Sequence, residues 1–235
     1  MKKPVFLLLL PILTLFSSCF AEIGGTLMVG GAAELTLKTT MGPRTTLLVR
    51  SLRSFMGSGG NAPILDAAAI SRSMALASGV KAVSLKNTSP EAMEGNISLS
   101  NIGDFLSSPE SGNRFITFTE GPEASTIVIS LDRASAPQII SRLSPEIIDY
   151  LSALMAPVAL GDIMSAREYI DLLASIYSRP LANEIAEGRI HTIIEFPRTV
   201  KSVQGGTFSG RKVEFDIPLL DILVLERSLR YEVSW

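Results

Sequence analysis

The sequence has 235 residues, 46% of them hydrophobic, and its 23 acidic and 21 basic residues give a formal net charge of −2. This hydrophobic content supports a packed core and excludes an intrinsically disordered chain. The near balance of charge provides no basic field for nucleic acid, so we expect no nucleic-acid partner. A single cysteine, Cys19, excludes an internal disulfide framework.

A short apolar leader opens the chain. Lys2 and Lys3 precede an apolar run, residues 5–16, that is about 12 residues long. A helix needs ~20 apolar residues to cross a bilayer, so this run suits an export signal rather than a membrane span. Residues 1–18 are therefore predicted to be a signal peptide.

The end of the leader carries the most specific motif of the sequence. Ser17 and Ser18, two small residues, directly precede Cys19. This arrangement resembles the lipobox of bacterial lipoprotein precursors, in which the cysteine is diacylated and becomes the new N-terminus. Phe16 departs from the common box, which has Leu at that position, and looser boxes of this kind occur in spirochaete lipoproteins.

The resemblance covers only the leader. It implies lipidation of Cys19, which would hold the protein permanently on a membrane of the bacterial cell envelope. The residues after Cys19, "FAEI", lack an aspartate that resembles an inner-membrane retention signal, which favours the outer membrane. A competing interpretation is a cut before Glu22 by an ordinary signal peptidase, with Cys19 and Ala21 at −3 and −1, which would discard the cysteine.

Several later segments alternate between apolar and polar residues, which is typical of strands with one buried face. The alternation is strict in residues 33–40, 212–217 and 229–235. Because one face of these strands is polar, we expect antiparallel pairing. Further strands are predicted at residues 25–29, 81–86, 96–100, 114–119, 125–131 and 189–196.

Helical patterns fall into two clusters. The first predicts helices over residues 45–56 and 63–77. In the second, Ser144 is a predicted N-cap with Pro145 at the first helical position, and Ser165 and Glu168 form a capping box. A shorter helix over residues 180–187 is predicted to end at Gly188.

The order of these segments predicts the fold class. Strands, then helices, then strands again favour a single α+β domain over residues 19–235. We expect an antiparallel sheet with helices packed on one face, and this sheet could curl around an apolar groove. The domain would lie in the periplasm or on the cell surface.

Residues capable of catalysis are scattered. His191 is the only histidine, and strand alternation places it on the same polar face as Glu195. The pair could act as a general base, but a surface histidine is the simpler interpretation. We therefore expect no catalytic residue and no enzyme activity.

Two acidic pairs lie at helical spacing, Glu168 with Asp171 and Glu184 with Glu187. Paired carboxylates could serve glycoside hydrolysis, but acids near a helix N-terminus also complement the helix dipole. With one histidine and a lipid-modified cysteine, we expect no metal site.

Two glycine-containing segments match cofactor or nucleophile motifs only formally. Residues 57–62 follow a predicted helix, whereas a dinucleotide-binding loop follows a strand. In residues 206–210 the serine stands one place too late for a nucleophile elbow, and a hairpin turn is the simpler interpretation. We predict no cofactor.

The apolar faces of the helices are the strongest candidate site. They could line a groove for an acyl chain or contact the bilayer, although covering the apolar face of the sheet is the simpler role. The candidate residues are Leu48, Leu52, Phe55, Met56, Ile70, Met74, Leu151 and Met155.

These observations favour a non-catalytic lipoprotein that binds lipid, another apolar ligand or the membrane surface through its helices. Such a protein resembles in kind the bacterial lipoprotein carriers, in which an antiparallel sheet curls over an apolar cavity. The alternative is an envelope assembly protein that holds other proteins at an exposed sheet edge, and the strand ending at Trp235 is the predicted edge.

Overall fold

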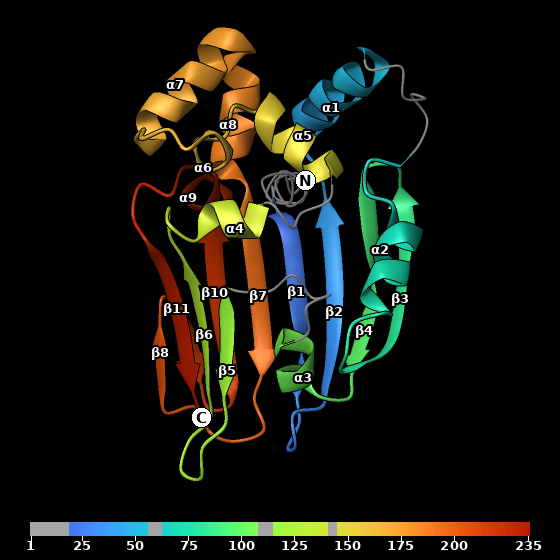
Figure 1. Ribbon diagram of the computed structural model, residues 1–235, viewed down its shortest axis with the longest axis vertical. Coiled ribbons are helices and arrows are strands. Elements are labelled where there is room, and N and C mark those ends of the chain that lie inside the picture. Colours follow the sequence, from blue (N-terminus) through green and yellow to red (C-terminus); the bar gives the residue numbers. More distant parts are fainter. Residues whose placement is uncertain (1–18, 56–62, 108–114, 141–144) are drawn as a thin grey trace, which may run out of the picture.

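The computed structural model describes residues 19–55, 63–107, 115–140 and 145–235. Its strands form a seven-stranded sheet in the order β3-β4-β2-β1-β7-β10-β9 and a four-stranded sheet in the order β5-β6-β11-β8 (Figure 1). The strands are β1 (Cys19–Leu27), β2 (Ala33–Thr40), β3 (Val80–Ser89), β4 (Ala92–Leu99), β5 (Ile116–Thr119), β6 (Thr126–Leu131), β7 (Arg189–Glu195), β8 (Ser202–Gln204), β9 (Thr207–Ser209), β10 (Lys212–Pro218) and β11 (Leu229–Ser234).

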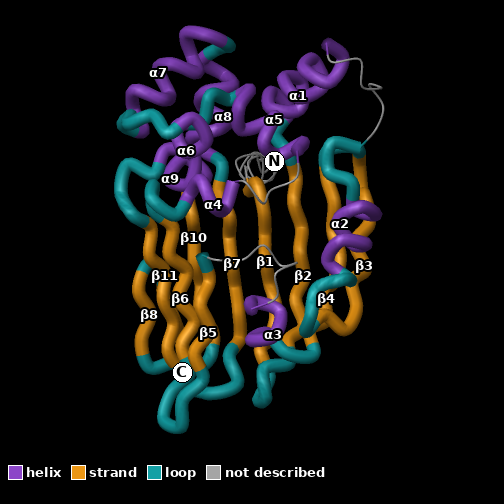
Figure 2. The backbone as a smooth tube through the Cα atoms, viewed as in Figure 1, coloured by secondary structure: helices purple, strands orange, loops and turns teal. Residues whose placement is uncertain are grey.

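Most helices gather at one end of the sheets, which we call the helical end (Figures 1 and 2). Of the helices in the described residues, only α2 and α3 lie alongside the strands. The helices are α1 (Pro43–Phe55), α2 (Ala67–Met74), α3 (Ile102–Ser107), α4 (Ala136–Ile140), α5 (Pro145–Ala153), α6 (Pro157–Leu160), α7 (Ala166–Ile176), α8 (Arg179–Glu187) and α9 (Leu219–Val224).

The α+β class predicted from the sequence is confirmed, and the sheet differs from the expectation in one pairing. β1 and β7 are parallel neighbours, with Ile23 opposite Thr192, whereas the other pairs of the seven-stranded sheet are antiparallel. β1 also begins at Cys19, before the predicted start at Gly25. The alternation of single strands could not reveal this pairing, because β1 and β7 are separated by most of the chain.

The main core lies between the two sheets. Val213 and Phe215 of β10 face Tyr231 and Val233 of β11, and all four are buried. The rings of Phe215 and Tyr231 meet edge to face with centroids 5.7 Å apart. The second sheet thus covers much of the face that we expected helices to cover, because its own strands supply apolar side chains to the main core, including Phe118, Ile127 and Val233.

A second core holds the helical end together. Tyr169 and Leu173 of α7 pack with Ile185 of α8 and Leu223 of α9, and each is buried. The Tyr169 hydroxyl donates a hydrogen bond to the carbonyl of Leu154, with an oxygen–oxygen distance of 3.0 Å. The helices therefore bury their apolar stripes mainly against one another.

The helix boundaries follow the capping signals. The Ser165 and Glu168 capping box is present at α7, and Gly188 follows α8 as its C-cap. The N-cap of α8, Ser178, was not among the predicted signals, and α2 is shorter than predicted because Asp66 caps it. The predicted N-cap Ser144 lies outside the described residues.

One edge prediction was wrong. The strand that ends at Trp235 is not an edge, because β11 lies between β6 and β8. The Trp235 side chain is buried, and its ring packs against Phe196 with a centroid distance of 4.6 Å.

Candidate functional site at the helical end

The backbone of Cys19 lies at the helical end. Cys19 is the first residue of β1 and pairs with Arg189, which follows the C-cap of α8. Two residues later, Ala21 pairs with Thr39 of β2 and with Ile190 of β7. The ladder thus holds the chain on both sides from the first residues after the predicted leader.

The predicted apolar residues lie in two separate places. Leu48 of α1 and Leu151 of α5 are half-buried and pack against the second core. Ile70 and Met74 lie on α2, beside β3, and Met74 packs against the main core. The structure therefore brings the first pair together and keeps the second pair apart from it.

Of the other predicted apolar residues, Leu52 and Met155 do not add to either of these two places. Leu52 is half-buried on α1, where the buried residues are Thr45, Thr46 and Val49. Met155 follows α5 with a left-handed backbone (φ 47°) and reverses the chain there. The side chain of Phe55 and all of Met56 lie outside the described residues.

Other large apolar side chains are exposed at the helical end. These are Leu47 on α1, Leu160 at the end of α6, Ile163 in the α6–α7 connection and Ile176 at the end of α7. Ile163 is the most exposed, at 91%. Helical periodicity could not identify it, because it stands between helices, next to Asp162.

The backbone around Ile163 is fixed by Arg133, which lies between β6 and α4. Its Nη1 donates to the carbonyl of Asp162 at 3.0 Å, and its Nη2 donates to the carbonyl of Met164 at 3.3 Å. The same guanidinium donates from Nε to the carbonyl of Leu225 at 2.8 Å and from Nη2 to that of Val224 at 3.3 Å. One side chain therefore joins the α6–α7 connection to the end of α9.

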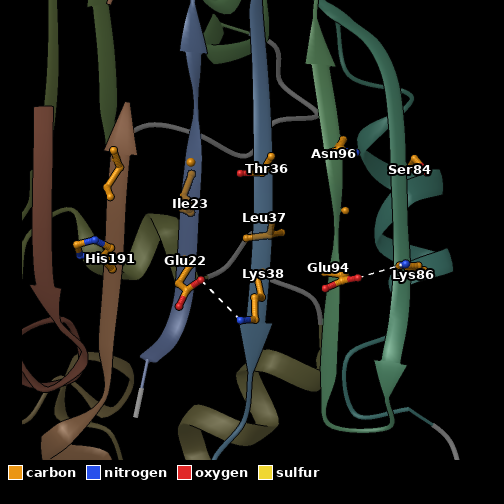
Figure 3. Close-up of a pocket in the computed structure, with 13 residues that line it drawn as sticks. Glu22, Ile23, Thr36, Leu37, Lys38, Ser84, Lys86, Glu94, Asn96 and His191 are labelled. Carbon is orange, nitrogen blue, oxygen red and sulfur yellow. Dashed lines mark ion pairs between the residues drawn. The ribbon is translucent and has the colours of Figure 1, made fainter. Parts of the chain in front are cut away.

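The open face of the seven-stranded sheet carries a polar groove of about 590 Å³ (Figure 3). Charges of opposite sign stand on adjacent strands: Lys38 Nζ lies 3.8 Å from Glu22 Oε2, and Lys86 Nζ lies 3.2 Å from Glu94 Oε1. Beside these charged residues, a row of uncharged residues crosses strands β3, β4, β2 and β1. Its members are paired in register and are Ser84, Asn96, Thr36 and Gly24. This surface can form hydrogen bonds, but its charges largely compensate one another.

His191 lines one side of this groove, on the polar face as expected. Its Nε2 lies 3.7 Å from Glu214 Oε1 of β10, whereas Glu195 pairs with Arg211. The hypothetical His191–Glu195 pair is therefore not formed. The exposed carboxylate of Glu214 is its acidic neighbour.

The acidic pairs have structural partners. Glu168 accepts the N–H of Ser165 and closes the capping box, and Asp171 pairs with Arg179. Bonds from the Ser165 hydroxyl and N–H hold the pKa of Glu168 below its ordinary value. Glu184 accepts the N–H groups of Arg44 and Thr45 at the start of α1.

The described part of the chain has neither a potential metal site nor a membrane-spanning helix. Within these residues, no three histidine, cysteine or acidic side chains lie close enough together to hold a metal ion. None of the described helices combines the length and apolarity that crossing a membrane requires.

The glycine-rich segment 57–62 lies outside the described residues, and residues 206–210 form part of a β9–β10 hairpin, as predicted.

Comparison with known proteins finds a weakly similar structure. No protein-family model and no curated protein matches the sequence. The fold is similar to the NMR structure of the folded domain of the Mycobacterium tuberculosis LppM protein, with a TM-score of 0.41 and 9% sequence identity. The similarity covers 92% of this chain and 89% of that one.

Proposed function

We propose that the protein is a lipid-anchored, non-catalytic protein of the bacterial cell envelope, held to its membrane through Cys19. The leader with its lipobox-like end supplies the first support. The Cys19 thiol would form a thioether with a diacylglyceryl group from a phospholipid, whose phosphate headgroup leaves while the thiol proton is released. Hydrolysis of the Ser18–Cys19 peptide bond would then free the new N-terminus.

The position of Cys19 in β1 is the observation that carries the proposal. A cut before Glu22 would remove residues 19–21 from the central ladder, where Cys19 pairs with Arg189 and Ala21 pairs with Thr39 and Ile190. A cut before Cys19 keeps every one of these pairs. Because backbone groups in a ladder need their partners, the lipoprotein cut leaves the better-paired domain.

The mass of the mature N-terminal peptide tests the proposal. We expect a peptide that begins at Cys19 and carries two or three acyl chains, and we expect the Cys19→Ser variant to lose both the acyl mass and stable membrane attachment. A wild-type mature chain that begins at Glu22 without a fatty acid would refute the proposal. Fractionation of the same cells tests the finer proposal that the protein lies in the outer membrane.

Of the binding roles considered, contact with a membrane surface has the better support. The groove on the open sheet face is lined by charged and polar side chains together with Ile23, Leu37 and Ile193, and its charged groups suit an apolar ligand poorly. Four of the eight large apolar side chains that are exposed in the described residues, including the most exposed one, Ile163, instead lie at the end of the molecule where Cys19 enters the sheet. His191 and the acidic pairs have partners that suit structural roles, which supports a non-catalytic protein.

A further inference from the structure

Four large apolar side chains at the helical end are between 50% and 91% exposed. We call this group, which consists of Leu47, Leu160, Ile163 and Ile176, the apolar rim. Isolated exposed apolar residues are common on protein surfaces, so the rim alone identifies no partner. Its position relative to the anchor and the fixed geometry of Ile163 add two independent constraints.

The anchor has no spacer. β1 begins at Cys19 itself, and Cys19 is paired with Arg189 at the base of the helices. α1 and α7 extend further from the sheets than the start of β1 does (Figure 1). A lipid on Cys19 would therefore bring the bilayer surface up to the helices, and the helical end would have to touch it.

The backbone on both sides of Ile163 is held in place. Arg133 binds the carbonyls of Asp162 and Met164, and the Met164 side chain packs against the second core. Ile163, between them, remains 91% exposed. Because the connection is already ordered, burying this side chain in a partner would cost little additional conformational entropy.

We propose that the helical end is the membrane-contact face of the protein, and that Ile163 inserts into the interface of the bilayer that anchors Cys19. This inference rests on the proposed lipid anchor. The free energy falls when an aliphatic side chain leaves water for the interfacial region of a bilayer, so this transfer favours membrane contact. The opposite end, where the β1–β2 turn exposes Val29, points away from the bilayer.

Site-specific labelling of the full lipidated protein tests the orientation. Acylation occupies the sulfur of Cys19, the only cysteine, so a cysteine introduced at position 163, 176 or 29 is the only free thiol. Each variant, Ile163→Cys, Ile176→Cys or Val29→Cys, is labelled with an environment-sensitive fluorophore. The protein is reconstituted into vesicles of phosphatidylethanolamine and phosphatidylglycerol, and an aqueous quencher is added. Val29 is the matched control, because it is 76% exposed at the far end.

We expect the quenching constant at position 163 to be several-fold lower than at position 29, with a blue-shifted emission at 163 only in the presence of vesicles. Equal quenching at the two positions on vesicle-bound protein overturns the inference and leaves the lipid anchor intact. Protection of position 163 in whole cells without protection on purified vesicles also overturns it and favours a partner protein. Failure to float with vesicles, together with a mature mass lacking acyl groups, refutes the anchor and the inference with it.

Discussion

The carboxylate of Glu184 on α8 accepts the backbone N–H of Thr45 in the first turn of α1, with an oxygen–nitrogen distance of 2.7 Å. The other carboxylate oxygen accepts the N–H of Arg44 at 3.0 Å. Glu184 thus satisfies two donors that a helix N-terminus leaves unpaired, and its charge complements the helix dipole. Glu184, which is far from α1 in the sequence, therefore caps this helix in place of a local N-cap residue.

We expect Glu184→Ala to lower the free energy of unfolding by about 1 kcal/mol, which is typical for the loss of a helix cap. Urea unfolding measures this change. Asn183→Ala, an exposed neighbour on α8, is the control and should change stability by less than about 0.5 kcal/mol.

Gly42 provides a second test of the same contact. A Cβ at Gly42 would lie 2.3 Å from the carboxyl carbon of Glu184, so Gly42→Ala should destabilise the protein by forcing the cap away. In the Glu184→Ala background the same substitution should cost much less, because the clash is gone. Additive effects of the two substitutions would contradict the described contact.

Tyr169→Phe should lower the free energy of unfolding by about 1–2 kcal/mol. The substitution removes the hydroxyl that bonds the carbonyl of Leu154 and leaves that carbonyl without this donor inside the second core. Chemical denaturation of the variant checks the value. Tyr177→Phe is the comparison: its hydroxyl bonds the carbonyl of Ala153 from a less buried position, so the loss should be smaller.

The capping box of α7 should make stability depend on pH. Hydrogen bonds from Ser165 hold the pKa of Glu168 below its ordinary value of 4.5, so the ionised form is favoured in the folded state. The resulting stabilisation is present above that ordinary value and is lost as pH falls through the lowered folded pKa. We expect Glu168→Gln to be less stable than wild type at about pH 6 and to approach it at about pH 3. A constant difference between the two proteins across this range would rule out the linkage.

Arg133→Lys should destabilise the protein by about 2 kcal/mol, although it keeps the charge. A lysine ammonium cannot reproduce the planar fork that reaches the carbonyls of Asp162, Met164 and Leu225. Hydrogen exchange should accelerate in residues 161–165 of the variant. Arg167→Lys, an exposed arginine on α7, should leave both stability and exchange unchanged.

Local patterns were enough to predict several elements. The alternation in residues 212–217 and 229–235 correctly placed Val213, Phe215, Tyr231 and Val233 in the core, since a strand turns successive side chains to opposite faces. The capping box at Ser165 was also correct, because its partners stand three residues apart. The α+β class followed from the order of these elements.

The predicted helix faces were less accurate. On α1 the buried positions are Thr45, Thr46 and Val49, whereas Leu47 is exposed and Leu48 only half-buried. The predicted residues Leu48 and Leu52 are half-buried, and the packing of α1 against α8 decided that the threonines face further inward than they do.

The sequence by itself predicted a leader that ends at Cys19, and it determined the alternating strands and the local caps, because each depends on residues that are neighbours along the chain. Only the tertiary structure decided that β1 lies parallel to β7, that Glu184 caps α1 and that Arg133 fixes the backbone around Ile163. Each of these contacts joins residues far apart in the sequence. They form because folding brings together backbone groups that local structure leaves unpaired, and no periodic pattern encodes that pairing.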